Sequence, residues 1–271
     1  MSISQDLQDL RDLSRERESL CYLISATKVE IKRVLRTTFP ELESIGNLYT
    51  RSMVRFLQQY PSARLVRAAK PKAIAKALKH PSVGNKLTLT AEDIMKAAQN
   101  SVATVSLAKG IIVRGKISTL LHFQERLAEV TKLLIDLCQR TRLEDLELLR
   151  SIRGLGFNTV APFLAEMGEV KNYRSSKKVI AYAGIDPSVH QSGKWIGMSK
   201  LSKRGNRHLR RAIYLMTASV MSQNAFFKAY FFKRKREGLA PQKAIFATAH
   251  KLIRVIFAML SKRTYFKIKE A

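Results

Sequence analysis

Cysteine is almost absent from this chain, which contains only Cys21 and Cys138. The two residues lie far apart and form no CxxC pair, so neither a disulfide framework nor a cysteine zinc site is predicted. No apolar run approaches the roughly 18 residues of a membrane-spanning helix, and the first residues lack a signal-peptide pattern. The five histidines are scattered without a ligand spacing such as HxxxH. We therefore expect a protein of the reducing cytoplasm that has no membrane partner and binds no metal by itself.

Acidic residues are also scarce, because 21 Asp and Glu face 49 Lys and Arg and give a formal charge of +28. The excess is uneven, since residues 194–271 hold 19 basic residues and only two acids. A field of this sign attracts polyanions in a salt-dependent way. DNA is the expected partner, which would place the protein at the nucleoid. The alternative is a solvated basic surface, as in a translation-associated protein.

Two apolar seams with heptad-like spacing predict two long coiled-coil-like helices. The first seam is Ile3, Leu10, Leu13, Leu20, Ile24, Ile31 and Val34, interrupted by Arg17 and Thr27. Pro40 is expected to end that helix. The second seam is Ile117, Leu120, Leu127, Leu134 and Cys138, with Gln124 and Thr131 between them. The second helix is either the antiparallel return of the first or a second dimer seam.

These patterns predict a mainly α protein of two domains, for which 271 residues at 46% hydrophobic content suffice. Residues 1–141 form a helical coiled-coil connector, in which no catalytic residue is expected. Asp6, Asp9 and Asp12 lie there among arginines, which favours a solvated face over a metal site. Residues 142–271 form a compact helical domain with a helix-hairpin-helix. The long helices are expected to join a homodimer or a higher oligomer.

The hairpin is predicted between Ile152 and Ala161. Two glycines at this spacing let a turn approach a phosphate, and the N-terminus of the next helix points its amide groups at the anion. The expected DNA contacts are Arg153, Gly154, Gly156, Asn158 and Thr159. They grip the backbone and read no base sequence. The alternative is an ordinary turn between two helices.

A polar loop opens at Asp186-Pro187 and contains Ser192 beside Gly193. A serine nucleophile for phosphoryl chemistry needs such access, with cations nearby to stabilise the transition state. The expected phosphate-binding cations are Lys194, Lys200, Lys203, Arg204, Arg207, Arg210 and Arg211. Most Ser-Gly pairs are turns, so the loop alone does not establish a nucleophile. Further on, residues 226–236 mix aromatics with cations, and these rings either stack unpaired bases or belong to the core.

Several blocks in order over about a hundred residues resemble the insertion-sequence 110/116/902 transposase family, which is related to pilin-type DNA invertases. They are Ile152-x-Gly154-x-Gly156-x2-Thr159-Val160-Ala161, Glu166-Met167-Gly168, Tyr173-Arg174-Ser175, Ala181-Tyr182-Ala183-Gly184-Ile185-Asp186-Pro187, Gln191-Ser192-Gly193-Lys194, Ser202-Lys203-Arg204-Gly205-Asn206 and Leu209-Arg210. The earlier helices, with Phe39-Pro40-Glu41, are similar to the connector that precedes this domain in the family.

The resemblance implies that Ser192 attacks a DNA phosphodiester and holds the strand as a phosphoserine, with Ser188 and Ser199 as alternatives. The family's RNase-H-like domain, with its four acids and magnesium, would lie upstream of the connector and is missing here. We therefore expect magnesium only with that missing domain, and the resemblance further implies a non-coding RNA as a guide.

The resulting hypothesis is a DNA-binding transposase that is truncated or one half of a split enzyme, and inactive alone. The alternative is a non-catalytic, structure-specific DNA-binding accessory protein of repair or recombination.

Overall fold

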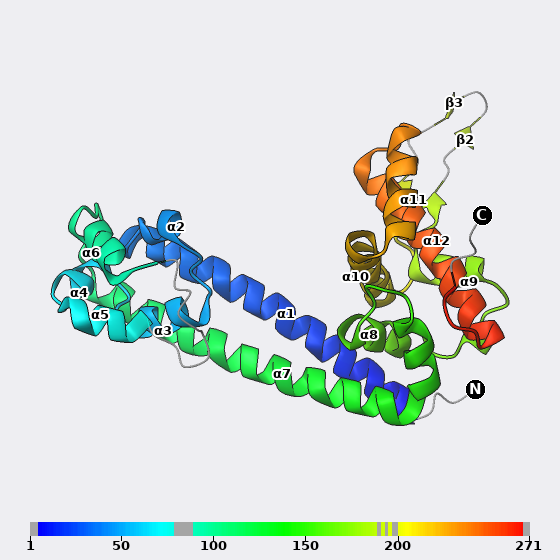
Figure 1. Ribbon diagram of the computed structural model, residues 1–271, viewed down its shortest axis with the longest axis horizontal. Helices are drawn as coiled ribbons and strands as arrows, with labels where there is room; N and C mark the ends of the chain where they lie inside the picture. The colour runs from blue at the N-terminus through cyan, green and yellow to red at the C-terminus, as the bar shows by residue number, and fades with distance from the viewer. Residues whose placement is uncertain (1–4, 79–88, 189–190, 193–194, 197–199, 268–271) are drawn as a thin grey trace. The chain divides into compact units, whose positions relative to one another are not determined.

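The computed structural model describes residues 5–78, 89–188, 191–192, 195–196 and 200–267, and not the side chains of residues 187–201. The elements before the middle of the chain are α1 (Gln5–Thr38), α2 (Leu42–Ile45), α3 (Arg51–Gln59), α4 (Ala63–Arg67), α5 (Pro71–Leu78), α6 (Ala91–Gln99) and α7 (Leu107–Arg150). The later ones are α8 (Phe157–Met167), a 3₁₀ turn (Val170–Asn172), α9 (Ser176–Ala183), α10 (Arg207–Gln223), α11 (Ala225–Arg236) and α12 (Pro241–Lys262) (Figure 1). The predicted mainly α fold is confirmed.

The chain divides into two compact units. The major unit contains Met1–Arg17 and Glu129–Ala271, and the minor unit contains Glu18–Ala128. Each of the long helices α1 and α7 therefore contributes one part to each unit. The sequence-based boundary between residues 141 and 142 stays a prediction. At that point the backbone of Arg142 leaves helical geometry, with φ −140° and ψ 34°, and kinks α7.

The two long helices contact each other in both units, and in the minor unit α7 runs antiparallel to α1. In the minor unit the Lys116 ammonium lies 3.5 Å from a carboxylate oxygen of Glu30. In the major unit Arg17 Nε donates to Thr131 Oγ1 at 3.2 Å. Also in the minor unit, the Thr104 N–H, just before α7, donates at 3.0 Å to the carbonyl of Thr37 near the end of α1, so α7 returns along α1 there. A coiled coil between two chains stays a prediction.

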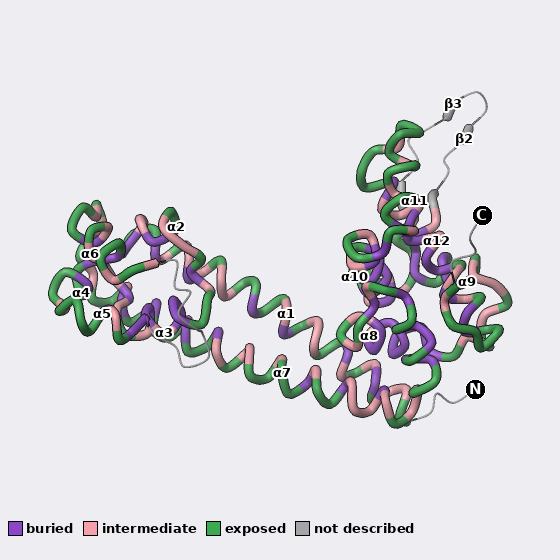
Figure 2. Tube along the Cα trace, in the orientation of Figure 1, coloured by how far each residue is buried: buried purple, intermediate pink, exposed green. Residues whose placement is uncertain are grey.

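The two apolar seams are largely buried against their surroundings. On α1 the buried members are Leu10, Leu20, Ile24 and Ile31, and on α7 they are Ile117, Leu120, Leu134 and Cys138 (Figure 2). Two of the polar residues that interrupt the seams, Arg17 and Thr131, bond to each other. The polar residue in one seam therefore hydrogen-bonds to the polar residue in the other, since a part-buried polar group needs such a partner.

The minor unit encloses its own core around Phe39, Phe56 and Ile74, to which α2 to α6 contribute. Helix α6 begins with a capping box. Thr90 Oγ1 accepts from the Asp93 N–H at 3.1 Å, while the Asp93 carboxylate accepts from the Thr90 N–H at 3.0 Å. These bonds from Thr90 lower the pKa of Asp93.

The major unit is built on α8, α10 and α12, with α10 packed against both of the others. Helix α12 is long and apolar enough to cross a membrane by length and composition, with a mean hydropathy of 1.5. However, eight of its residues, among them Leu252, Ile253 and Ile256, are buried in the major unit. A core helix meets the same criterion. The apolar composition of α12 is therefore explained by its place in the core.

Candidate nucleic-acid interface and serine arm

The segment from Gly184 to Asn206, which we call the serine arm, leaves α9 and returns to α10. Backbone bonds hold its two ends side by side, because the Asn206 N–H donates to Tyr182 O at 2.7 Å and the Lys203 N–H donates to Gly184 O at 3.1 Å. Strand β1 (Pro187–Ser188) continues this pairing with β4 (Lys200–Leu201), in antiparallel register. The arm therefore starts from a fixed base.

Two glycines let the ends of the arm approach each other. Gly184 ends α9 with φ +65°, and a Cβ there would lie 2.5 Å from the Arg204 carbonyl oxygen. Gly205 has φ +134°, and a Cβ there would overlap the carbonyl of Tyr182. Any side chain at these two positions would push the two ends of the arm apart. The close approach of these ends therefore explains both glycines, although they belong to separate motif blocks.

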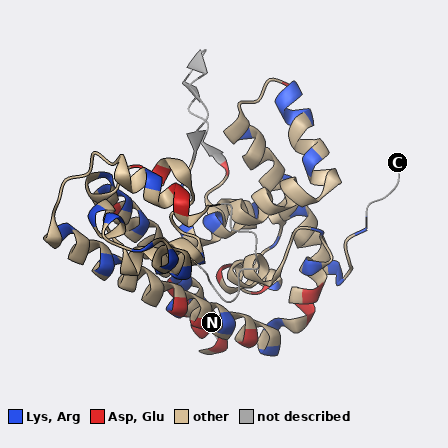
Figure 3. Ribbon diagram, turned by 60° about the vertical axis from the view of Figure 1, so that its left-hand side comes forward, with Lys and Arg blue, Asp and Glu red and all other residues tan. Residues whose placement is uncertain are grey.

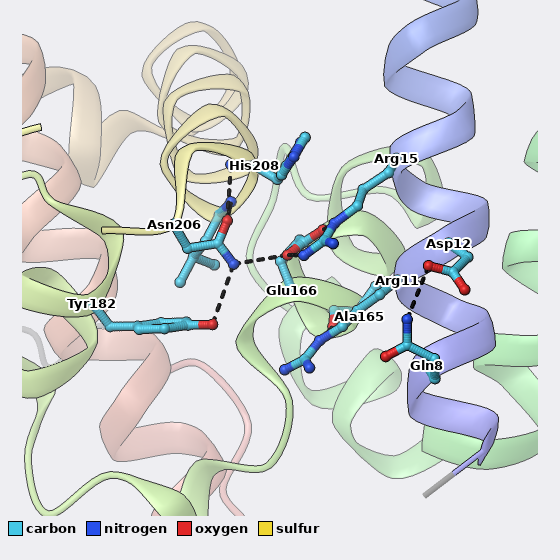
Figure 4. Close-up of polar contacts among 10 residues, drawn as sticks. Gln8, Arg11, Asp12, Arg15, Ala165, Glu166, Tyr182, Asn206 and His208 are labelled. Atoms are coloured by element: carbon cyan, nitrogen blue, oxygen red, sulfur yellow. Dashed lines mark hydrogen bonds and ion pairs between the residues drawn. The ribbon is translucent and has the colours of Figure 1, made fainter. Parts of the chain in front are cut away.

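A buried carboxylate lies beneath the base of the arm (Figure 4). Glu166, near the end of α8, is only 1% exposed. Arg15 of α1 donates to it twice, from Nε at 2.9 Å and from Nη2 at 3.2 Å. Asn206 Nδ2 adds a third bond at 2.8 Å. The buried charge is thus paired and bonded, as its burial requires.

Asn206 is the junction between this carboxylate and the arm. Its side-chain oxygen caps α10 by accepting from the N–H groups of His208 and Leu209, at 2.9 and 3.0 Å. Its amide nitrogen bonds Glu166 and lies 3.4 Å from the Tyr182 hydroxyl. On the other side of the carboxylate, the hydrogen bond that Arg15 itself donates to Glu166 is the main cause that raises the pKa of Arg15. One network therefore joins α1, α8, α9 and α10 at the arm's base.

Strand β2 (Gln191–Ser192) pairs with β3 (Trp195–Ile196), and Ser192 lies opposite Trp195. This places the Ser192 backbone in the outer of the arm's two strand pairs. The side chains of Ser192, Ser188 and Lys200 lie outside the described residues, as do all atoms of Lys194 and Ser199. The roles expected for them stay predictions.

The turn between α7 and α8 uses its two glycines differently. Gly154 has φ +102°, and a Cβ there would lie 3.0 Å from the carbonyl of Ser219 on α10. Ser219 Oγ also donates to the Gly154 carbonyl at 2.5 Å. Around Gly156, which precedes α8, a Cβ would meet nothing within 4 Å. Packing on α10 therefore explains Gly154 without any ligand, whereas Gly156 faces open space, and the helix-hairpin-helix stays a prediction.

The other residues expected to contact DNA fall into two groups. Exposed side chains belong to Arg153, Asn158, Lys203, Arg204, Arg207 and Arg211. Thr159 instead bonds the backbone of Gly156 through its hydroxyl, at 3.2 Å to the nitrogen. Arg210 donates from Nη1 to the Ala183 carbonyl at 3.0 Å. Thr159 and Arg210 thus bond to the fold itself, whereas the side chains of the first group reach solvent.

No three His, Cys, Asp or Glu side chains lie close enough to hold a metal ion within the described ranges. Asp9 and Asp12 accept hydrogen bonds from Gln5 and Gln8 on an exposed part of α1. Charge in these ranges is mostly basic, with acids interleaved among cations near the N-terminus (Figure 3).

Comparison with known proteins shows which family part of this chain resembles. Residues 146–231, which contain the α7–α8 turn, the buried carboxylate and the whole serine arm, match the Transposase IS116/IS110/IS902 family. This part of the chain is similar to that transposase family.

Several relatives match different shares of the chain. The uncharacterized 43.6 kDa protein of insertion element IS110 from Streptomyces coelicolor is 24% identical over 89% of the chain and 60% of its own length. The pilin gene-inverting protein of Moraxella bovis is 29% identical over 44% of the chain and 38% of its own length. The transposase for insertion sequence element IS1111A from Coxiella burnetii is 26% identical over 46% and 35%. The chain spans 60% or less of the length of these relatives.

The contact between Arg15 and Glu166 is the feature of the site that sequence reasoning missed. Glu166 and Asn206 both stood in recognised blocks, but nothing local connected them. Arg15 lies 151 positions before Glu166 in the chain. A lone acid within the apolar run of α8 was the available signal, because a buried acid needs a cationic partner somewhere.

Proposed function

We propose that this chain binds DNA and takes part in DNA transposition or site-specific recombination, with Ser192 as the nucleophile. The observation that carries the proposal is that the family's motif blocks, distant in sequence, converge on the base of one arm. Glu166, Tyr182 and Asn206 come from three blocks and meet in one network.

In the proposed step, Ser192 Oγ forms a bond to the phosphorus of a DNA phosphodiester. The bond from phosphorus to the leaving sugar oxygen breaks, and the serine proton is transferred to that oxygen. The strand stays attached as a phosphoserine, and a DNA hydroxyl later reverses the exchange. Exposed cations around the arm, namely Lys203, Arg204 and Arg207, would stabilise the added charge on the phosphate.

The remaining partners are part of the same proposal. Strand cleavage would need the acidic, magnesium-binding domain of the family, on the same polypeptide or a separate one, so this chain alone would bind DNA without cleaving it. A non-coding RNA would guide the choice of target. Tyr22 and Val29, seven positions apart on α1, are 73% and 65% exposed. Such an apolar stripe supports a homodimer through the long helices. The protein would act in the cytoplasm, at the nucleoid.

The decisive test is covalent trapping. The chain is expressed together with an acidic domain of the same family and DNA carrying the element ends, and DNA that remains bound to protein in SDS is measured. We expect an adduct that Ser192→Ala abolishes and Ser188→Ala retains. An adduct that persists in Ser192→Ala would refute the assignment. DNA binding with no adduct in any variant would instead favour the non-catalytic accessory protein.

A further inference from the structure

The inner face of α11 is fully used by the fold. Phe227 is buried and stacks on Phe266, with ring centroids 6.0 Å apart. The Lys251 ammonium of α12 lies between two rings of α11, 4.1 Å from the Phe226 centroid and 4.3 Å from that of Tyr230. The sequence-based alternative that these aromatics belong to the core thus describes the inner face of the helix.

The outer face of α11 has a different composition. Lys228, Phe232, Lys235 and Arg236 are spaced four, three and one residues apart, so they share one helical stripe. All four are exposed, and Phe232 is exposed to 48%. Within the described part of the chain, none of these three cations has an acidic or aromatic partner. We call these four residues the outer stripe.

Helix stability and core packing account for only part of the outer stripe. Lys235 and Arg236 lie in the last turn of α11, where the helix dipole stabilises cations. Lys228, however, lies at the fourth residue of the helix, where the dipole disfavours a cation. Phe232 touches Phe231 at a centroid distance of 5.4 Å and leaves about half of its surface in water. An aromatic ring exposed between cations is the combination that binds unpaired bases together with their phosphates.

We propose that the outer stripe of α11 binds an unpaired DNA strand, with a base stacked on Phe232 and phosphates held by Lys228, Lys235 and Arg236. The inference rests on the proposed function, because cleavage and exchange of strands expose unpaired DNA. The stripe favours a single strand over a duplex, since the bases of a duplex are stacked on one another and offer no free face. It is separate from the α7–α8 turn, where a duplex backbone would bind.

The test measures binding of the full-length chain to fluorescent oligonucleotides by anisotropy, using a 20-nucleotide dT strand, the matching RNA strand and a 20-base-pair duplex. Phe232→Ala is expected to weaken binding of the dT strand by about tenfold while leaving duplex binding unchanged. Phe232→Leu keeps an apolar side chain of similar size without a π face, so it should lose binding as the alanine variant does. Phe232→Trp should retain it, and its emission should be quenched by the strand.

The charge contribution is tested with Lys228→Gln, which should reduce the salt dependence of dT binding by roughly 0.7 in log–log slope. Lys72→Gln, an exposed lysine on α5 in the minor unit, is the matched control and should change nothing. The proposal is overturned if Phe232→Ala and wild type bind the dT strand with equal affinity, or if the wild type prefers the RNA strand at least tenfold. In either case, binding of the duplex would leave the proposed function standing. If none of the three oligonucleotides binds, both the outer-stripe proposal and the proposed function are overturned.

Discussion

At Gly184 and Gly205, backbone conformation and space both exclude a side chain. Gly238, at the end of α11, also has a positive φ, +88°, but a Cβ there would meet nothing within 4 Å. Gly205→Ala should therefore destabilise the protein by about 3 kcal/mol, and Gly238→Ala by about 1 kcal/mol, since only the former adds overlap to strain. Urea unfolding of the two variants measures the difference. Equal losses would show that the arm's base yields to a methyl group.

Cys138 shows how burial affects a single ionisable group. Desolvation raises the pKa of its thiol from 9.0 to about 11. Between these values the unfolded chain loses the thiol proton and the folded chain keeps it, so the free energy of unfolding falls as pH rises from 9 to 11. At pH 10 the loss should be about 1 kcal/mol relative to pH 8. Chemical unfolding of wild type and Cys138→Ala at both pH values isolates this contribution, which should be absent from the variant.

Among the elements, α1 and α8 are joined by the ion pair of Arg15 with the buried Glu166. Arg15→Ala would leave that carboxylate with Asn206 as its one described donor and should cost about 2–3 kcal/mol of stability. Glu166→Gln together with Arg15→Ala should recover part of this loss, because the neutral amide needs no cation. Arg33, which pairs with Glu30 at 2.6 Å on the exposed side of α1, is the control. Arg33→Ala should cost at most about 0.5 kcal/mol, and an equal cost for both arginines would contradict the account.

At the scale of the whole molecule, the charge of +28 predicts duplex DNA binding that weakens steeply with salt. About four phosphate contacts would give a log–log slope near −3.6. Gly156→Val should lower affinity without lowering stability, since its side chain enters open space where the phosphate is expected. Gly154→Val should instead destabilise the fold, because it meets α10. Anisotropy titrations at several salt concentrations, with unfolding curves of both variants, provide the measurement, and unchanged affinity for Gly156→Val would remove the turn from the interface.

The helical character, the apolar seams and the basic charge can all be predicted from the amino-acid sequence. Periodicity identified Leu10, Ile24, Ile117 and Leu120 as inward residues, and all four are buried. These features are local, because a helix repeats every 3.6 residues and its buried side follows from that repeat. The strand pairing of the arm at Ser192 and Trp195 was not anticipated, since two-residue strands carry no periodic signal.

The partners of individual residues, in contrast, follow from the folded chain and not from local sequence. In the folded chain Arg15 donates to Glu166, Arg17 donates to Thr131, and Arg210 donates to the Ala183 carbonyl. The tertiary structure also distinguishes Gly154, packed on α10, from Gly156, open to solvent, although the two look alike in the motif. The physical reason is that local sequence shows that a buried charge needs a partner of opposite charge, and that a left-handed backbone needs a glycine. It does not show which residue pairs with the charge or packs on the glycine, because that residue can come from any part of the chain that folding brings near.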